Sequence, residues 1–364
     1  MNTIEKALMH GLFIHLHHNI DKAIDFSVFK KLNETVAQES PGRLLIGPDA
    51  NDDAAVFQMP GDAGLVVAKM ESHCSPCVPR PYDSAATGAG GAMRDVIAMG
   101  ARPLFLLDFI GTRPLDEEVI VGPCGFKGRC TCGECKTMTS GERVNLIVKG
   151  IRDMCEKMGV FVVGGGLSTS FSDIVPAVVA AVIGRMIVDE PLTKPAKKAG
   201  DCLIIAGRTG NDGNDTLYRA GLAEVMRPAV ALFAEERTTM EASLAAIKTG
   251  LINACSDLGA AGIGAAVSES ARFGGLGAHV DLARAPVNME GLTPEEILIC
   301  ETQGRMLFQV APENATTVLE TLKSEGAPAA EIGTITEGKE SIFTFEGNEV
   351  ARIPHEPPAE LFED

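Results

Sequence analysis

A lysine, a carboxylate and an imidazole alternate in the segment KMESH, as Lys69, Glu71 and His73. They end an apolar segment, residues 65–70, that is typical of a strand, and side chains two residues apart in a strand share one face. Such a face can bind phosphate through the lysine, bind a metal through the carboxylate and move a proton through the histidine near neutral pH. The alternation therefore predicts a polar site at this strand end.

An acidic cluster precedes this strand, in GPDANDDAAVF at residues 47–57. Asp49, Asp52 and Asp53 lie in a turn-forming sequence just before apolar residues. Carboxylates placed in this way are typical ligands of Mg²⁺, usually together with substrate phosphates. Ordinary turn chemistry, in which Asp and Asn bond their own backbone, explains the spacing equally well.

Small residues dominate the segment after Tyr82, where SAATGAGGAMRD (residues 84–95) ends in Arg94 and Asp95. Backbone N–H groups in a loop of this kind can approach phosphate oxygens, and a helix beginning there adds its positive end. Close helix packing uses the same small residues, so the run alone leaves both interpretations open. Neither a P-loop nor a dinucleotide-binding fingerprint is present.

The second half of the chain carries two further polar clusters. Asp257 precedes a Gly/Ala run within residues 255–271, and ICETQGRM places Glu301, Gln303 and Arg305 between a helix and a strand. A charged cluster beside apolar residues is either a solvent-exposed turn or a ligand-binding site. Taken by itself, this cluster favours the solvent-exposed turn.

Four of the ten cysteines gather in GPCGFKGRCTCGECK, residues 122–136. The glycines allow a metal knuckle, and the neighbouring lysines and arginine would lower thiol pKa values. We predict a metal centre for Zn²⁺ or an iron–sulfur cluster on Cys124, Cys130, Cys132 and Cys135. Cys74 and Cys77 could instead pair with the last two of these cysteines, and free or redox-active thiols are the alternative to any metal.

Length and charge exclude several classes of protein. A chain of 364 residues suits two domains of ~100–200 residues each. With 49 acidic against 32 basic side chains, the net charge of −17 disfavours nucleic-acid and membrane-surface partners. No apolar run reaches the ~18 residues of a membrane span, and residues 1–25 lack signal-peptide features. We expect a cytoplasmic protein whose cysteines are thiols or metal ligands.

Strand-like and helix-like segments are mixed in both halves, which predicts an α+β protein of two domains. A helix is expected after Thr139, which forms a capping-box pattern with Glu142. The Pro/Lys/Gly segment 190–201 marks the boundary. The expected units are a helical N-terminal segment (1–43), a first domain (44–189), a second domain (200–347) and a tail (348–364).

Several of these motifs, taken in order, resemble phosphoribosylformylglycinamidine synthase, a member of the AIR synthase (PurM-like) superfamily. The matching segments include AKMESH, AATGAGGAMRDVIAMGARPLFLLD, GRTGNDG, SDLGAAGIGAAVSESA and MEGLTPEEILICETQGRML, between residues 44 and 336. The resemblance implies an N-terminal ferredoxin-like α/β domain that forms a shared barrel on dimerisation, and a C-terminal α+β domain. It also implies an ATP- and Mg²⁺-dependent ligase that phosphorylates an amide oxygen, which ammonia then displaces.

Carried over by position, the resemblance gives the motifs roles. His73 would be the catalytic acid/base, and Glu71, Asp95 and Asp257 would hold Mg²⁺. ATP would contact Lys69, Asp52, Asp53, Tyr82, Thr87 and Gly88. A phosphorylated or amide substrate would contact Ser72, Arg94, Glu301, Thr302 and Gln303. The implied partners are a second copy of the chain, as a homodimer, and a separate glutaminase subunit, because no glutaminase part is recognisable.

Four departures from the family fall mainly on the substrate side. Residues 74–77 read CSPC where the family has Asn-His-Pro-Ser, residues 229–232 contain no Gln, and no Glu follows Gly165 and Gly166. The family synthetase also fuses two such units, so this one would dimerise to complete its cleft. The alternative functions are an ATP-dependent phosphotransferase acting on another small molecule and a non-catalytic nucleotide- or metal-binding scaffold.

Overall fold

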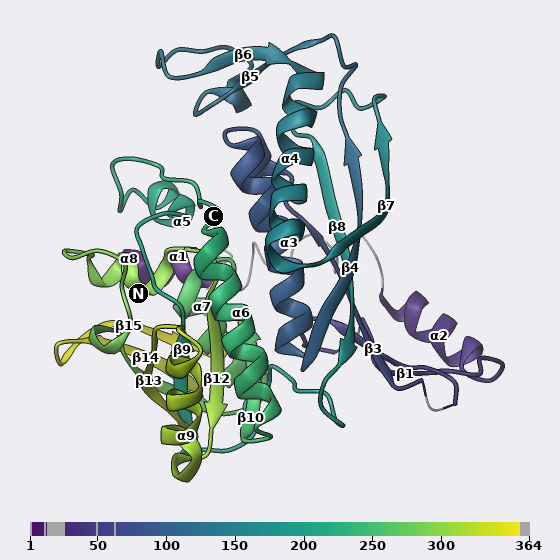
Figure 1. Ribbon diagram of the computed structural model, residues 1–364. Coiled ribbons are helices and arrows are strands. Elements are labelled where there is room, and N and C mark those ends of the chain that lie inside the picture. The colour runs from purple at the N-terminus through teal and green to yellow at the C-terminus, as the bar shows by residue number, and fades with distance from the viewer. Residues whose placement is uncertain (1, 11, 13–25, 49, 62, 357–364) are drawn as a thin grey trace.

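The computed structural model describes residues 2–10, 12, 26–48, 50–61 and 63–356. Two mixed sheets form the framework, and Figure 1 shows them side by side, the first in blue and teal and the second in green and yellow. Both sheets carry helices, so the predicted two-domain α+β architecture is confirmed. No helix in the described part of the chain is long and apolar enough to cross a membrane.

The first sheet has six strands in the order β1-β2-β3-β8-β4-β7. Its neighbours are antiparallel except β4 and β7, which are parallel. The strands are β1 (Arg43–Ile46), β2 (Ala55–Gln58), β3 (Leu65–Ser72), β4 (Ala101–Gly111), β7 (Phe161–Ser168) and β8 (Ala177–Met186). Helices α3 (Pro81–Ala98) and α4 (Ser140–Met158) cover one face (Figure 1).

The first sheet and its two helices follow the chain order β1-β2-β3-α3-β4-α4-β7-β8, with the pair β5-β6 between β4 and α4, whereas a ferredoxin-like unit has the order β-α-β-β-α-β. The difference arises because α4 carries the chain back along the sheet, which lays β7 parallel to β4 at the edge. Helix α4 begins with the predicted capping box: the Thr139 side chain accepts from the backbone of Glu142, and the Glu142 carboxylate accepts from that of Thr139.

The second sheet has seven strands in the order β10-β12-β9-β13-β11-β14-β15. Helices α6 (Phe233–Lys248) and α9 (Pro312–Ser324) share a core with the first domain, whereas α1 (Thr3–His10), α7 (Gly262–Phe273) and α8 (Pro294–Ile299) belong to a separate core. The strands are β9 (Cys202–Ala206), β10 (Ile252–Asp257), β11 (Gly277–Asp281), β12 (Met306–Val310), β13 (Ala329–Thr336), β14 (Glu340–Phe345) and β15 (Asn348–Pro354).

Residues 348–354, expected in a tail, form β15 at the edge of the second sheet. Ala351 and Ile353 are buried there, and this apolar contact holds the segment in the sheet. The remaining elements are short: α2 (Phe26–Val36), α5 (Asp215–Arg219), the pair β5 (Glu118–Val121) and β6 (Lys136–Thr139), and the 3₁₀ turns η2 (Ser75–Cys77), η3 (Gly125–Lys127) and η4 (Leu282–Arg284).

The face of the first sheet opposite α3 and α4 presents exposed apolar side chains. Met70 is 71% exposed on β3 and Phe161 is 75% exposed on β7. Leu107 and Phe109 on β4 are also exposed on this face. Isolated apolar side chains are common on protein surfaces, but a group of this kind on neighbouring strands is typical of an interaction surface. We call this group of side chains the open face.

Candidate functional site between the two domains

Strand β3 runs along helix α3, and its alternate side chains meet successive turns of that helix. Lys69 Nζ lies 2.9 Å from Asp95 Oδ2, which confirms that the inward face of β3 points at α3. Further along β3, a Cβ added at Gly91 would lie 3.0 Å from Glu71 Oε2, and one added at Gly88 would lie 2.6 Å from His73 Cβ. The small-residue run is therefore a buried helix, and its glycines make room for the polar face of β3.

The phosphate-loop interpretation of residues 84–95 is wrong, because these residues lie inside α3 and their backbone N–H groups bond within the helix. Thr87 and Gly88, predicted to contact ATP, lie beside His73. Thr87 Oγ1 donates to the Ser84 carbonyl oxygen at 3.1 Å. The space around His73 is thus filled by α3 on this side.

His73 is held in one orientation by the helix. Its Nδ1 lies 2.5 Å from the Ser84 carbonyl oxygen, which can only accept, so Nδ1 carries the proton and Nε2 is the basic nitrogen. Burial lowers the pKa of His73, with a smaller contribution in the same direction from Arg94. A neutral, oriented imidazole suits a general base at neutral pH.

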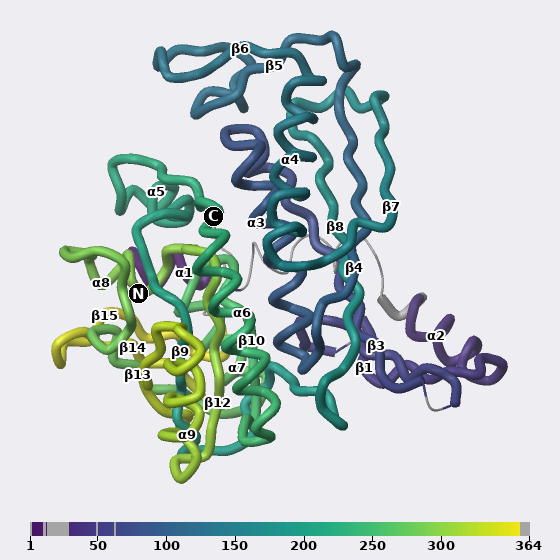
Figure 2. The backbone as a smooth tube through the Cα atoms, viewed as in Figure 1, coloured from purple at the N-terminus to yellow at the C-terminus, as the bar shows by residue number. Residues whose placement is uncertain are grey.

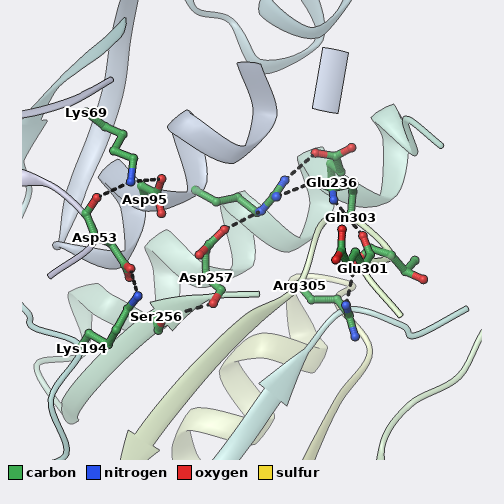
Figure 3. Close-up of polar contacts among 12 residues, drawn as sticks. Asp53, Lys69, Asp95, Lys194, Glu236, Ser256, Asp257, Glu301, Gln303 and Arg305 are labelled. Carbon is green, nitrogen blue, oxygen red and sulfur yellow. Dashed lines mark hydrogen bonds and ion pairs between the residues drawn. The ribbon is translucent and has the colours of Figure 1, made fainter. Parts of the chain in front are cut away.

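Three carboxylates from distant parts of the chain converge where the domains meet. Asp53 precedes β2, Asp95 belongs to α3 and Asp257 ends β10, and one oxygen of each lies within 4.8 Å of the others. Figure 3 shows Asp53 and Asp257 beside Lys69 and Asp95. Burial raises the pKa of both Asp53 and Asp257, and the charge of Asp95 adds to this effect.

This carboxylate set fits a hard divalent cation. Carboxylate oxygens that converge in a buried site are typical ligands of Mg²⁺. Asp53 Oδ2 is buried and has no hydrogen-bond partner, so it is available as a ligand. The structure brings together two of the three predicted Mg²⁺ ligands, Asp95 and Asp257, and adds Asp53, which was predicted to contact ATP.

The third predicted metal ligand, Glu71, lies outside the three-carboxylate set. Its carboxylate faces Gly91 one helical turn from Asp95. Burial, followed by the charge of Asp95, raises the pKa of Glu71 to about 7. Alternate side chains of β3 point to the same face, so Glu71 lies on the same face as Lys69 and two residues after it. Lys69 itself contacts Asp95.

Lys194 also lies at this site, although its segment was interpreted as a domain boundary. Its Nζ lies 2.5 Å from Asp53 Oδ1 and 3.2 Å from Glu269 Oε2. Its backbone N–H donates to Asp52 Oδ1 at 2.7 Å, so Asp52 anchors this segment and lies outside the three-carboxylate set. Pro191 and Pro195, which flank Lys194 in PLTKPAKK, were the available sign that the segment has a fixed path, although they do not specify a partner.

Arg94 joins the carboxylates to the second domain. It donates to Glu236 Oε2 at 3.0 Å and to Gln303 Oε1 at 2.6 Å, and its Nε lies 3.6 Å from Asp257 Oδ2. Its side chain is 2% exposed and that of Glu236 is 0% exposed. Glu236 on α6 was also missed, because nothing in its local sequence distinguishes it from a solvent-facing helix residue.

Residues 301–303 form the wall beside Arg94, as Figure 3 shows for Glu301 and Gln303. Gln303 Nε2 donates to the Glu301 carbonyl oxygen at 2.8 Å, and Glu301 Oε1 accepts from the backbone of Ala261 at 3.0 Å. Thr302 is fully buried, accepts from Gly210 at 2.8 Å and donates to Asp212 at 2.6 Å. Thr302 therefore holds the loop, while the carboxylate of Glu301 and the amide of Gln303 remain the groups suited to a ligand.

Two predicted site residues lie elsewhere, and Asp49 is outside the described residues. Ser72 is exposed on the opposite side of β3 from Lys69 and Glu71, because adjacent strand residues point to opposite faces. Tyr82 is near the start of α3, roughly 20 Å along the helix from Asp95 at about 1.5 Å per residue. Its hydroxyl donates to Asp153 Oδ2 at 2.8 Å on α4.

The four cysteines of residues 122–136 form a separate cluster. All four Sγ atoms lie within 4.8 Å of one another. Cys74 and Cys77 have other partners: Cys74 Sγ accepts from the backbone of Val178 at 3.3 Å, and Cys77 Sγ donates to the His73 carbonyl oxygen at 3.0 Å. The pairing of Cys74 and Cys77 with the later cysteines is therefore not formed.

Known proteins match this chain over both domains. Residues 51–186 match the N-terminal domain of AIR synthase related proteins, and residues 198–346 match the C-terminal domain. The phosphoribosylformylglycinamidine synthase subunit PurL of Methanocaldococcus jannaschii is 34% identical over 362 residues, which cover 97% of this chain and 46% of that protein. The chain thus spans about half the length of the curated relatives it matches.

Solved structures agree with this match. PurL of Thermotoga maritima complexed with ATP is 29% identical with a TM-score of 0.66, over 80% of this chain and 43% of that chain. The same protein complexed with FGAR is 28% identical with a TM-score of 0.67, over 84% and 46%. The PurLQS structure from that organism is 30% identical with a TM-score of 0.65, over 80% and 44%. The chain therefore belongs to the AIR synthase-related family, as a relative of the synthase subunit PurL.

Proposed function

We propose that this chain is an ATP- and Mg²⁺-dependent synthetase of the PurL type, which forms a carbon–nitrogen bond on a phosphorylated amide substrate. The observation that carries the proposal is the meeting of Asp53, Asp95 and Asp257 from both domains beside Lys69. A cluster of buried acidic groups with two adjacent lysines, Lys69 and Lys194, suits a nucleotide bound as its magnesium complex. The PurL structures named as complexes with ATP and with FGAR (formylglycinamide ribonucleotide) support this assignment.

The three carboxylates would hold Mg²⁺, and the bound ion would neutralise negative charge on the triphosphate of ATP. Lys69 would bind a phosphate oxygen of ATP. The amide oxygen of the substrate attacks the γ-phosphorus and ADP leaves, and ammonia then attacks the activated carbon and inorganic phosphate leaves. His73 Nε2 takes the proton that the attacking nitrogen must lose, because its neutral imidazole is oriented by Ser84.

A substrate phosphate or carbonyl would be bound by Arg94 together with Glu301 and Gln303. In the structure the Arg94 guanidinium already contacts Glu236 and Gln303. A substrate that binds Arg94 must therefore compete with a buried carboxylate. This contact favours, as the second candidate, an ATP-dependent phosphotransferase whose small-molecule substrate differs from FGAR.

We also propose that the open face of the first sheet contacts a second copy of the chain. Its support is the exposed Met70, Leu107, Phe109 and Phe161, which a dimer would bury. Sedimentation velocity at micromolar concentration should give twice the chain mass of 38.3 kDa, and a monomer would contradict the proposal.

Ammonia would come from a separate glutaminase subunit, and the assembly named PurLQS supports a partner of this kind.

Free ammonia can replace the partner in a test. With Mg²⁺, ATP and ammonia present, we expect FGAR to raise the rate of ADP release by at least tenfold, measured by a coupled assay. ADP release that is independent of FGAR would favour the phosphotransferase.

A further inference from the structure

The cysteine cluster has no place in the reaction above and lies at the other end of the first domain. It occupies the connection between β5 and β6, which Figure 2 shows beyond the ends of α3 and α4. Cys124 is buried, while Cys130 and Cys132 are exposed and Cys135 is intermediate. All four are free thiols in the structure.

The spacing of the sulfur atoms fits one small metal ion. Cys132 Sγ lies 3.2 Å from Cys124 Sγ, 4.0 Å from Cys130 Sγ and 3.7 Å from Cys135 Sγ. A zinc–sulfur distance of about 2.3 Å places the sulfurs of a tetrahedral site roughly 3.8 Å apart. An iron–sulfur cluster stands between its thiolates and would hold them farther apart, and a disulfide needs its two sulfurs at about 2.05 Å.

The backbone is shaped around these sulfurs. The N–H of Glu134 donates to Cys132 Sγ at 3.4 Å, and the N–H of Cys124 donates to Cys135 Sγ at 3.3 Å. Gly133 adopts a φ of 77°, a conformation that other residues rarely adopt and that turns the chain between the last two cysteines. N–H donors stabilise sulfurs that carry negative charge, as metal-bound thiolates do.

The loop is too polar to hold this shape by burial. Phe126 is its largest apolar side chain and is 43% exposed, and Lys127, Arg129 and Lys136 are also exposed. A segment that cannot bury an apolar core needs a metal or a disulfide to fix its conformation.

We propose that Cys124, Cys130, Cys132 and Cys135 bind a single Zn²⁺ ion that fixes the β5–β6 connection. The buried end of this connection touches the segment after His73, since a Cβ added at Gly125 would lie 2.5 Å from Val78 Cγ1. The ion is structural, because four protein ligands leave no open position for a substrate. The proposal does not depend on which reaction the other site performs.

Metal analysis of the full-length protein, purified without chelators, tests the proposal. We expect close to one zinc per chain in the wild type and less than a tenth of that in Cys132→Ser. The matched control is Cys74→Ser, which should keep its zinc, because Cys74 lies outside the cluster. One iron per chain in place of zinc, or full zinc retention in Cys132→Ser, would overturn the proposal.

A second measurement covers the case in which Cys132→Ser fails to fold. Release of zinc from the wild-type protein by a mercurial reagent should require four thiols per ion, and trypsin should then cleave at Lys127 or Arg129 much faster. A wild-type protein that contains no metal and already reacts with a thiol reagent at all four cysteines would also overturn the proposal. Neither readout depends on turnover of ATP.

Discussion

Asp257→Asn is expected to lower Mg²⁺-dependent ATP turnover by about 100- to 1000-fold, the range found when one charge-stabilising group is removed from an active site. The oxygen of Asp257 that lies within 4.8 Å of Asp53 and Asp95 is a metal ligand in this account. Asparagine keeps the size of the side chain but removes the negative charge that the cation requires. The measurement is kcat/KM for ATP with Mg²⁺ in excess.

The same substitution should not lower the thermal stability of the nucleotide-free protein. Burial and the charge of Asp95 raise the pKa of Asp257, so the native state disfavours its charged form. The control is Asp281→Asn, a second-domain carboxylate whose role is to accept from the backbone of Ala283. If Asp257→Asn and Asp281→Asn turn over ATP equally well, Asp257 is not a metal ligand.

Arg94→Met is expected to lower the free energy of unfolding by about 3–5 kcal/mol, because it leaves buried acidic groups without their cation. Glu236 has no exposed surface and lies 3.0 Å from the guanidinium, and Asp257 lies 3.6 Å from it. The protein contains no tryptophan, so urea unfolding is best followed by circular dichroism. Adding Glu236→Gln should recover part of the loss, because it removes the buried acidic group that the guanidinium contacts at 3.0 Å.

A surface ion pair supplies the control for this prediction. Arg102 contacts Glu241 at 2.7 Å and 3.0 Å, but its side chain is 39% exposed. Arg102→Met should therefore cost no more than about 1 kcal/mol. Equal effects of Arg94→Met and Arg102→Met would mean that the Arg94 pair does not hold the two domains together.

The parts of the site that depend on neighbours in sequence were predictable. The alternation of Lys69, Glu71 and His73 places them on one face of any strand, and Thr139 with Glu142 marks a helix start in any protein. The cysteine cluster was equally visible, because its four thiols lie within residues 122–136. In each case the spacing along the chain determines the spacing in space.

The parts that depend on the packing of distant segments were not predictable from these patterns. Asp53, Asp95 and Asp257 meet only because the two domains share one core. Lys194 lay in a segment whose composition indicated a linker, and Glu236 lay on an otherwise unremarkable helix. The resemblance to a known family supplied Glu71, Asp95 and Asp257 as the Mg²⁺ set, and the structure adds Asp53 beside the last two.

The helix α3 shows why composition alone can mislead. Gly and Ala within residues 84–95 suit a phosphate loop and a closely packed helix equally well. The neighbours decide between them: β3 brings His73 and Glu71 so close to α3 that larger side chains would clash at Gly88 and meet the carboxylate at Gly91. That information lies in the strand, about fifteen residues away, and not in the glycine run.

The most direct test of the proposed function is the rate of ADP release by anaerobically purified protein whose metal content has been verified. The assay contains Mg²⁺, ATP and ammonia, with and without FGAR, and Asp257→Asn is the inactive control. The account predicts release that depends on FGAR and is lost in the variant. Tight nucleotide binding with no response to FGAR would contradict the synthetase and favour another substrate, and no nucleotide binding at all would contradict the site itself.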